Sequence, residues 1–332
     1  MSNILAVDIG GTKTIVALFE VVDNVLNLKH QHQYASQSFT SFSDILVDFK
    51  KRFLTTSIDA ASLGVAGPVI EGNCKTTNLP WGINGRELKK QLNTTKVKLL
   101  NDLEATAYGM LYLDENEFVE LNPKAKVTQG NRAVIAAGTG LGEAQLFWDG
   151  EGYHPIGSEG GHCDFAPVSV EQDALLVWLR SQYPNHVSYE RILSGPGIAA
   201  LYDFLVSSGF AKENEKIKHL SEDSDRSAMI SHCALEENDP LCRETLRLFA
   251  EIYGAEAGNL ALKSMSLGGV YIGGGIAPKI LPFIRSRDFM DAFVKKGRFE
   301  KILSDIPVKI SLNPETALLG AAYYARDRLL KN

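Results

Sequence analysis

Short apolar runs separated by a glycine-containing turn open the chain. Residues 4–7 are apolar, residues 8–12 form a polar turn with two glycines, and residues 14–19 are apolar again and rich in β-branched side chains. Such runs favour strands, and glycine accepts the backbone angles of a tight turn. The pattern therefore predicts a β-hairpin with an unusually bare loop.

The residues that follow alternate between helical and strand patterns. Spacing typical of an amphipathic helix covers 42–54, and a second helical stretch covers 106–113. Two continuous apolar runs, 61–66 and 97–100, are typical of buried strands. Strands and helices that alternate in this way favour an α/β protein over an all-β sandwich or a helical bundle.

A second hairpin pattern, at 133–147, matches the first in the same register. Gly138 lies 128 positions after Gly10, and Phe147 lies 128 positions after Phe19. The match predicts a duplicated unit. The pattern alone leaves coincidence open, because the chain holds 29 glycines.

The remaining residues are rich in helical patterns. Helical spacing covers 175–180, 197–207 and 245–265, and the last of these carries small residues where another helix can approach closely. A buried strand over 268–272 opens into a triple-glycine turn. An amphipathic helix is expected over 315–330.

Composition narrows the class of protein. With 332 residues the chain exceeds what one hydrophobic core usually serves, so about two domains are expected. A 45% share of hydrophobic and a 22% share of charged residues, with a mean hydropathy of −0.07, are typical of a soluble globular protein. The net charge of −6 offers no positive field to a phosphate backbone, so nucleic acid is not an expected partner.

Membrane and export segments are not expected either. No apolar run approaches the roughly 18 to 20 residues of a membrane span, and the first residues do not resemble a signal peptide. The histidines have no companions at metal-binding spacing, so no transition-metal site is expected. The four cysteines form no C-x-x-C pair, which argues against a disulfide framework and fits a reducing cytoplasm; they are Cys74, Cys163, Cys233 and Cys242.

Three glycine-rich turns are candidates for phosphate binding. Backbone N–H groups without a Cβ nearby can approach phosphate oxygens closely. Each turn alone is weak evidence, because a single turn is more often a tight hairpin and neither Walker nor Rossmann spacing occurs. The turns are Asp8-Ile9-Gly10-Gly11-Thr12, Gly138-Thr139-Gly140 and Gly273-Gly274-Gly275.

Several polar side chains are candidates for catalysis or sugar binding. Asn101 and Asp102 follow a predicted strand, at the end where α/β sheets present ligand-binding groups; Asp102 can accept a proton there or can cap the next helix. Glu159 and His162 flank two glycines and can face one sugar ring, or can be a surface glutamate and a core histidine. Glu190 opens a helical stretch, where a glutamate usually complements the helix dipole.

Eight strings along the chain carry a family resemblance. They are DIGGT at 8–12, GVAGPV at 64–69, TNLPW at 77–81, NDLEA at 101–105, GTGLG at 138–142, SEGGHCDFAP at 158–167, LSGPG at 193–197 and IGGGIAP at 272–278. In this order and spacing they resemble the bacterial glucokinase family, within the actin, Hsp70 and sugar kinase superfamily. The resemblance covers nearly the entire chain.

The resemblance implies a fold. It implies an α/β protein with the two-domain actin-like ATPase fold, duplicated ribonuclease-H-like cores and an interdomain cleft in which sugar and nucleotide meet. The smaller domain would take residues 1–112 plus 313–332, and the larger domain residues 113–312. The predicted repeat agrees with this architecture.

The resemblance also implies a function, namely ATP-dependent phosphorylation of glucose to glucose 6-phosphate, the first step of glycolysis, by a cytoplasmic homodimer. Asp102 resembles the base that accepts the proton of the sugar 6-hydroxyl, and Asp8 a group that reaches Mg²⁺ through water. The turns at 10–12 and 138–140 resemble phosphate hairpins, and 273–275 an adenosine surface. The groups that resemble holders of the sugar hydroxyls are Asn101, Glu159, His162 and Glu190, with Asn78 as a less certain neighbour.

One departure from related proteins matters. Kinases of the related repressor-and-kinase (ROK) group usually bear a cysteine-rich zinc motif where Cys163 stands alone, so no zinc is expected. No helix-turn-helix pattern precedes Ile4, which disfavours the DNA-binding repressors of that group. A kinase for another hexose or an amino sugar, a non-catalytic sugar sensor and an actin-like ATPase remain as alternatives.

Overall fold

The chain forms two compact units. The computed structural model describes residues 1–76, 78–221 and 224–331, so Thr77, in one of the eight strings, lies outside the described residues. The first unit comprises Met1–Glu117, Ala144–Gly157 and Asn313–Asn332, and the second comprises Phe118–Glu143 and Ser158–Leu312. The expected domain division, 1–112 with 313–332 against 113–312, stays a prediction.

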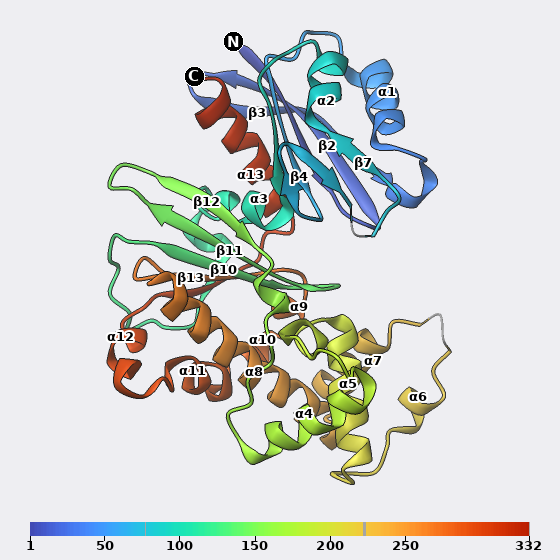
Figure 1. Ribbon diagram of the computed structural model, residues 1–332, viewed down its shortest axis with the longest axis vertical. Coiled ribbons are helices and arrows are strands. Elements are labelled where there is room, and N and C mark those ends of the chain that lie inside the picture. Colours follow the sequence, from blue (N-terminus) through green and yellow to red (C-terminus); the bar gives the residue numbers. More distant parts are fainter. Residues whose placement is uncertain (77, 222–223, 332) are drawn as a thin grey trace. The chain divides into compact units, whose positions relative to one another are not determined.

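A five-stranded sheet forms the centre of the first unit (Figure 1). Its strands are β1 (Ser2–Ile9), β2 (Lys13–Val22), β3 (Val25–Ala35), β4 (Ala60–Val65) and β8 (Val97–Asn101). The order is β3-β2-β1-β4-β8. β1 and β2 form the predicted hairpin, whereas β1, β4 and β8 run parallel to one another.

Helices cover both faces of this sheet. They are α1 (Phe42–Phe53), α2 (Gly85–Leu92) and α13 (Thr316–Tyr324). Successive residues of a strand point to opposite faces, so Leu5 and Val7 join the core that contains α1 and α2, while Ile4 and Ala6 join the core that contains α13. Figure 1 shows α1 and α2 on one side of the sheet and α13 on the other. A strand covered on both faces explains the continuous apolar run at 4–7.

Helix α3 (Asp102–Gly109) packs against α13 with the two backbones in close contact. A Cβ at Gly320 would overlap the carbonyl oxygen of Ala105 and lie 2.7 Å from the backbone nitrogen of Gly109. A Cβ at Gly109 would overlap the carbonyl oxygen of Thr316. Glycine is therefore required at both positions, and this contact fixes the axis of the helix that begins at Asp102.

The second sheet repeats the order of the first. Its strands are β9 (Phe118–Glu120), β10 (Arg132–Ala137), β11 (Leu141–Trp148), β12 (Tyr153–Ser158), β13 (Val270–Gly273) and β14 (Val308–Ser311). The order β12-β11-β10-β13-β14-β9 reproduces that of the first sheet and adds β9 at one edge. β10, β13 and β14 run parallel, as β1, β4 and β8 do.

The two hairpins also coincide in position. β1 ends at Ile9 and β10 ends at Ala137, 128 residues later; β2 begins at Lys13 and β11 begins at Leu141, again 128 residues later. The predicted duplication is confirmed, with strand order and chain register both preserved.

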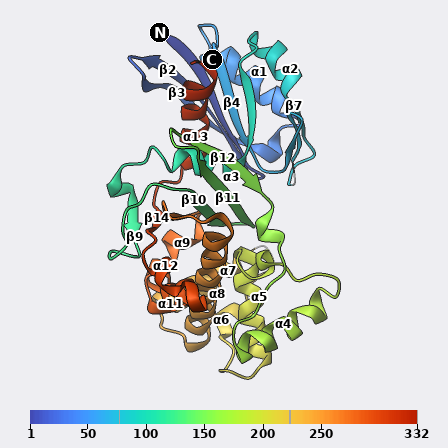
Figure 2. The same cartoon turned by 60° about the vertical axis from the view of Figure 1, so that its left-hand side comes forward.

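The helices of the second unit gather around α8 (Pro240–Ser264), as Figure 2 shows. α5 (Gly195–Ser207) and α11 (Arg287–Val294) pack on it. A Cβ at Gly254 would lie 2.7 Å from the carbonyl carbon of Phe289 in α11, so the predicted close approach at small residues occurs here. Other helices of this unit are α4 (Val170–Gln182), α6 (Glu215–Lys218), α7 (Arg226–Leu235), α9 (Ile276–Lys279), α10 (Leu281–Ile284) and α12 (Glu300–Ser304).

Three local predictions need correction. α3 begins at Asp102 and not near residue 106, because Asn101 caps it. Glu190 lies in a separate 3-10 turn, Tyr189–Arg191, and α5 begins only at Gly195, where Ser194 is the cap. The last helix, expected over 315–330, is helical as predicted, but it is an α-helix only over Thr316–Tyr324 and continues as a π-helix over Ala325–Leu329.

A small sheet is an addition that the sequence did not predict. It consists of β5 (Val69–Ile70), β6 (Asn73–Lys75) and β7 (Gly82–Asn84), which come between β4 and α2 in the chain.

Within the described part of the chain, no helix combines the length and the apolar character that a bilayer crossing requires.

Replacing Gly320 by alanine should destabilise the protein. The atoms that a Cβ would meet belong to the backbone of α3 and cannot rotate away, and overpacking of this kind typically costs about 1–3 kcal/mol or more. Urea unfolding measures the loss. Gly82→Ala is the matched control, since a Cβ there meets none of the described atoms within 4 Å. Equal stability of the two variants would contradict the packing argument.

Candidate active site

Strand ends bring the polar residues of the first unit to one edge of its sheet. Because β1, β4 and β8 are parallel, Ile9 pairs with Val65 and Val65 pairs with Asn101. The turn at 10–12 and the pair Asn101-Asp102 therefore leave the sheet at neighbouring points. In open α/β sheets, ligands bind outside this edge.

Asn101, not Asp102, is the cap of α3. Its Oδ1 accepts a hydrogen bond from the backbone N–H of Leu103 at 2.8 Å, and its own backbone N–H donates to Glu104 Oε2 at 2.8 Å. Its Nδ2 donates to the carbonyl oxygen of Gly67 at 3.2 Å. Asp102 is the first helical residue; it is half-buried, and its Oδ1 also accepts from the Leu103 N–H, at 3.0 Å. The helix thus does not depend on Asp102 for its cap.

Asn78 lies beside the first glycine turn. A Cβ at Gly11 would lie 2.7 Å from the Cβ of Asn78, so this close approach requires glycine. The N–H of Gly10 donates to the carbonyl oxygen of Lys13 at 2.9 Å and closes the turn, and Thr12 is exposed at its tip. The structure thus brings the less certain sugar residue into contact with a predicted phosphate turn.

Asp8 lies half-buried near the end of β1. Desolvation raises the pKa of this carboxyl to about 6, and the positive charge of Lys13 opposes the shift. A carboxylate shielded from water in this way is chemically suited to a nearby hard cation such as Mg²⁺, which prefers oxygen ligands. Groups of three or more His, Cys, Asp or Glu that could hold a metal ion do not occur among the described residues.

The other two glycine turns lie side by side in the second unit. They follow β10 and β13, which are parallel neighbours, so both turns leave the same edge of the sheet. Gly274 has a φ of 80°, and a Cβ on it would lie 2.9 Å from the carbonyl carbon of Ala137. A Cβ at Gly138 or Gly275 would meet none of the described atoms within 4 Å. There is therefore room for a ligand beside Gly138 and Gly275, although the N–H of Gly138 already donates to the carbonyl oxygen of Gly140 at 2.8 Å.

The carboxylate of Glu190 supports the turn at 138–140. Its Oε2 accepts a hydrogen bond from the backbone N–H of Leu141 at 3.0 Å, and a Cβ at Gly140 would overlap this carboxylate. Thr139 is exposed at the tip of the turn. A predicted sugar residue and a predicted phosphate turn are thus in direct contact, which corrects the expectation that Glu190 only complements a helix dipole.

Glu159 and His162 lie at the two ends of a tight loop. The backbone N–H of His162 donates to the carbonyl oxygen of Glu159 at 3.0 Å, and both side chains are exposed, so His162 is not a core histidine. A Cβ at Gly161 would lie 2.8 Å from the carbonyl carbon of Leu141. Leu141 is therefore contacted both by this loop and by Glu190, which gathers the predicted sugar residues of the second unit around the start of β11.

Tyr253 is a residue that sequence reasoning missed. It is fully buried in α8, and its hydroxyl donates to the carbonyl oxygen of Ile135 at 3.3 Å and accepts from the backbone N–H of Ala137 at 3.1 Å. These bonds hold the last residues of β10, directly before Gly138. Tyr253 lies in an apolar stretch of helix, so its spacing indicates only core packing. The one sign in the sequence of a further role was its hydroxyl group, because a buried tyrosine hydroxyl needs a hydrogen-bond partner.

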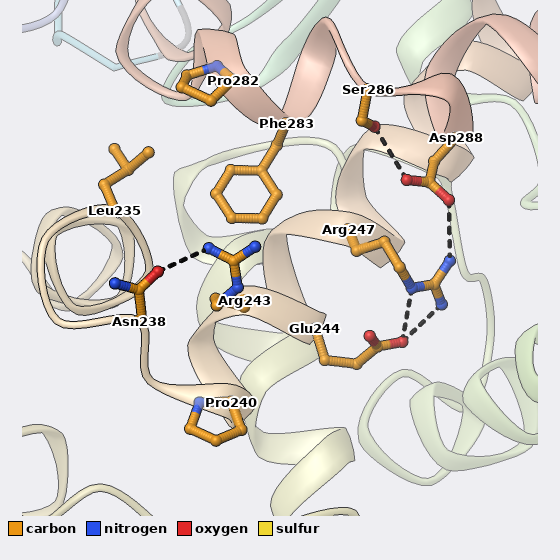
Figure 3. Close-up of a pocket in the computed structure, with 10 residues that line it drawn as sticks. All are labelled: Leu235, Asn238, Pro240, Arg243, Glu244, Arg247, Pro282, Phe283, Ser286 and Asp288. Atoms are coloured by element: carbon orange, nitrogen blue, oxygen red, sulfur yellow. Dashed lines mark hydrogen bonds and ion pairs between the residues drawn. The ribbon is translucent and has the colours of Figure 1, made fainter.

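A surface pocket of about 690 Å³ lies elsewhere in the second unit, among α7, α8, α10 and α11 (Figure 3). Arg243 lies over the ring of Phe283, 5.5 Å from its centroid. Arg247 pairs with Glu244 at 2.6 Å and with Asp288 at 3.8 Å. None of the predicted site residues of the second unit lines this pocket, and carboxylates neutralise Arg247, so it is not the candidate active site.

A duplicated α/β unit, with glycine turns and carboxylates at the carboxyl ends of parallel strands, defines a sugar kinase of the actin-like ATPase fold. Comparison with known proteins agrees. The family model described as glucokinase matches residues 5–328. A glucokinase of Nostoc punctiforme is 40% identical, over 98% of this chain and 99% of that protein. The chain belongs to the glucokinase family.

Solved structures give the same result for the fold. The crystal structure of a glucokinase from an Antarctic psychrotroph has a TM-score of 0.86 at 32% identity, and the match covers 98% of this chain and 99% of that one. A ROK family glucokinase from Streptomyces griseus, solved in complex with glucose and AMPPNP, has a TM-score of 0.66 at 18% identity, with 98% and 99% covered.

Replacing Tyr253 by phenylalanine should weaken nucleotide binding. The N–H of Ala137 loses its partner, which costs about 1–3 kcal/mol, and the turn at 138–140 loses its anchor, so we expect KM for ATP to rise about three- to tenfold. Tyr202→Phe is the control, because its buried hydroxyl accepts the N–H of Asn214 at 3.0 Å in the same unit. Steady-state kinetics and urea unfolding of both variants are compared. A similar rise of KM for ATP in the control would refute the anchoring role.

Replacing Asp8 by asparagine should stabilise the metal-free protein at neutral pH. The folded protein keeps this carboxyl protonated up to about pH 6, whereas the unfolded chain loses the proton near 3.8, so unfolding releases a proton and stability falls as pH rises through this window. The free energy of unfolding of the variant should therefore exceed that of the wild type by up to about 3 kcal/mol above pH 6 and by little below pH 4. Urea unfolding in EDTA across this range measures the difference, with exposed Asp114→Asn as the control. A gain that does not change with pH would contradict the assignment.

Proposed function

We propose that this protein transfers the terminal phosphoryl group of ATP to the 6-hydroxyl of glucose, with Asp102 as the general base. ATP-dependent phosphorylation of glucose is the activity of the family to which the chain belongs. The observation that supports this role of Asp102 is that its neighbour Asn101, and not Asp102 itself, caps the start of α3. Asn101 supplies the cap, and Asp102 keeps a carboxylate at the carboxyl end of β8, where the helix N-terminus favours its negative charge.

The sugar would be held by a set of polar side chains. Hydrogen bonds from carboxylate, amide and imidazole groups to hydroxyls are directional, and a site built from them can reject an analogue that lacks a hydroxyl by about 10⁴-fold. Glu159, His162 and Glu190 carry this selectivity in our proposal, because Leu141 ties their segments together. The complete set is Asn78, Asn101, Asp102, Glu159, His162 and Glu190.

The nucleotide would bind along the three glycine turns, at 10–12, 138–140 and 273–275. Backbone N–H groups of these turns would donate to phosphate oxygens, with room for the ligand beside Gly138 and Gly275, and the contact with Glu190 fixes Gly140 in place. Mg²⁺ bound with ATP would neutralise phosphate charge, and Asp8 would hold it through water. The relative from Streptomyces griseus that was solved with glucose and AMPPNP supports this pair of ligands.

Positioning contributes most of the rate in this proposal. Phosphoryl transfer leaves little covalent work to a protein, so alignment of the sugar hydroxyl and stabilisation of charge on the phosphate dominate. General base catalysis by Asp102 adds about 10² to 10⁴. As the 6-oxygen of the sugar bonds to the terminal phosphorus, the bond from that phosphorus to the β–γ bridging oxygen breaks and ADP leaves, while the proton of the 6-hydroxyl moves to the Asp102 carboxylate.

The alternatives predict different assays. A kinase for another hexose or an amino sugar would be found with a coupled assay on glucose, mannose, fructose, glucosamine and N-acetylglucosamine. Release of ADP without sugar would favour an actin-like ATPase, and tight glucose binding without turnover would favour a sensor. A homodimer and a cytoplasmic location belong to the same proposal and are tested by light scattering and by cell fractionation.

Replacing Asp102 by asparagine should abolish most of the activity. Asparagine keeps the shape and the hydrogen bond to Leu103 but cannot take the proton, so kcat should fall about 10²- to 10⁴-fold while KM for glucose changes little. The coupled assay measures both constants, and thermal unfolding verifies that the variant is folded. Asp114→Asn, an exposed aspartate of the same unit, should keep wild-type kinetics. A folded Asp102→Asn protein with near-normal kcat would refute the assignment of the base.

A further inference from the structure

A pair of buried carboxyl groups lies behind the loop that carries Glu159 and His162. Glu143, on β11, is 1% exposed, and Glu256, on α8, is 0% exposed. The carboxyl of Glu143 lies against the backbone of Gly160, where a Cβ would overlap its Oε2 and lie 2.8 Å from its Cδ. The hydroxyl of Ser158 donates to the carbonyl oxygen of Glu143 at 3.0 Å. The loop at 158–162 therefore rests on Glu143.

Few groups donate hydrogen bonds to the two carboxyl groups. Glu256 accepts from Lys263 Nζ at 3.0 Å and from Asn259 Nδ2 at 2.8 Å. The carboxyl of Glu256 is within hydrogen-bonding reach of Glu143. Among the described residues, no N–H or O–H group donates to the buried Oε1 of Glu143. If both carboxyls were ionised, two buried negative charges would have only Lys263 as a directly bonded cation. That state is unfavourable, so the pair should keep one proton.

Other charged groups around the pair modify this balance. Burial and the charge of Glu256 raise the pKa of Glu143 to about 7, and Lys263 opposes the shift. The remaining titratable groups that face the pair or its lysine are Tyr253 on α8, Tyr189 in the turn before Ile192, Lys296 after α11, and Cys163 after the loop. Burial raises the pKa of both tyrosines.

The same network reaches the turn that carries Glu190. Asn259 Nδ2 donates to the hydroxyl of Tyr189 at 3.2 Å, and Asn259 Oδ1 accepts from Lys296 Nζ at 2.6 Å. Tyr189 directly precedes Glu190 in the 3-10 turn. One buried network therefore touches both sugar-binding segments of the second unit.

The fold does not require a carboxylate at position 143. Ile15 lies 128 residues earlier, at the corresponding position of the first hairpin, and it is a buried core residue. The same strand can therefore be built with an apolar side chain, which avoids the cost of a buried ionisable group.

We propose that Glu143 and Glu256 form a proton-sharing pair that positions the loop at 158–162 and the turn at 189–191 for sugar binding, so that loss of the shared proton weakens the binding of glucose. The inference rests on the proposed roles of Glu159, His162 and Glu190. With one proton the pair is a hydrogen-bonded unit of single negative charge beside Lys263. Without it, two carboxylates repel each other directly beneath Gly160. Both are positioning residues and make no contact with the sugar in this proposal.

Glucose binding without nucleotide tests the proposal, measured by isothermal titration calorimetry between about pH 6 and about pH 8.5 in buffers of different ionisation enthalpy. We expect the wild-type Kd to rise about tenfold across this range, with uptake of a fraction of a proton on binding near pH 7. Glu143→Gln mimics the protonated form, so its Kd should stay near the low-pH value and show no linked proton. Glu143→Ile should raise Kd about tenfold at every pH.

Matched variants separate the outcomes. Glu244→Gln, on the same helix but outside the network, should keep the wild-type pH curve. If Glu143→Gln fails to fold, Glu256→Gln replaces it, because its amide oxygen still accepts from Lys263. A wild-type Kd that does not change with pH, or a glutamine variant that keeps the wild-type pH dependence and proton uptake, overturns the pair.

A further variant distinguishes this failure from that of the proposed function. Glu159→Gln should weaken glucose binding at all pH values if the loop holds the sugar. If Glu159→Gln binds glucose normally, the proposed sugar site is wrong. If it binds poorly while the Glu143 variants follow the wild-type curve, the sugar site stands and the positioning pair is wrong.

Discussion

The parallel pairing of β1 with β4 and of β4 with β8, and likewise of β10 with β13 and of β13 with β14, is the constraint on which the candidate site depends. Parallel neighbours end at the same edge of a sheet, so residues separated by many positions in the chain meet there. Because of this register Asp8 and Asn101 lie toward the same edge of the first sheet, and the turns at 138–140 and 273–275 leave the same edge of the second. Antiparallel neighbours in place of β4 or β13 would send these segments to opposite edges.

Each copy of the hairpin keeps one carboxylate that the other copy lacks. Asp8 corresponds to Ala136, and Ile15 corresponds to Glu143, both at the offset of 128. Asp8 and Ile15 are also cross-strand partners in the first hairpin. Asp8 and Glu143 therefore occupy the same cross-strand pair of the repeated hairpin, Asp8 on its first strand and Glu143 on its second. An apolar residue serves at either position in the other copy. The hairpin therefore does not need the charge, and each carboxylate is better explained by what lies beside it, a proposed phosphate turn for Asp8 and the loop at Gly160 for Glu143.

The sequence pattern was sufficient wherever one local rule decides the structure. Both hairpins followed from short apolar runs on either side of a glycine turn, and Asn101-Asp102 was found because a polar pair ended a buried strand. The start of α3 was missed because a cap at Asn101 outweighs the apolar spacing that begins later. Tyr253 and the pair Glu143–Glu256 could not be found, since whether a polar group is buried against a partner depends on residues more than 100 positions away.

The two glycine turns are closed alike but differ in the side chain that supports them, and this difference bears on function. A backbone hydrogen bond closes each turn: the N–H of Gly10 donates to the carbonyl oxygen of Lys13, and the N–H of Gly138 donates to the carbonyl oxygen of Gly140. In the second turn the N–H of Leu141, the residue that corresponds to Lys13, also donates to the carboxylate of Glu190. The first turn instead packs at Gly11 against the side chain of Asn78. The second turn shares the Glu190 carboxylate with the proposed sugar site. A sugar that forms a hydrogen bond with Glu190 would therefore also affect the backbone proposed to hold phosphate. The sequence of the turn alone does not reveal this connection.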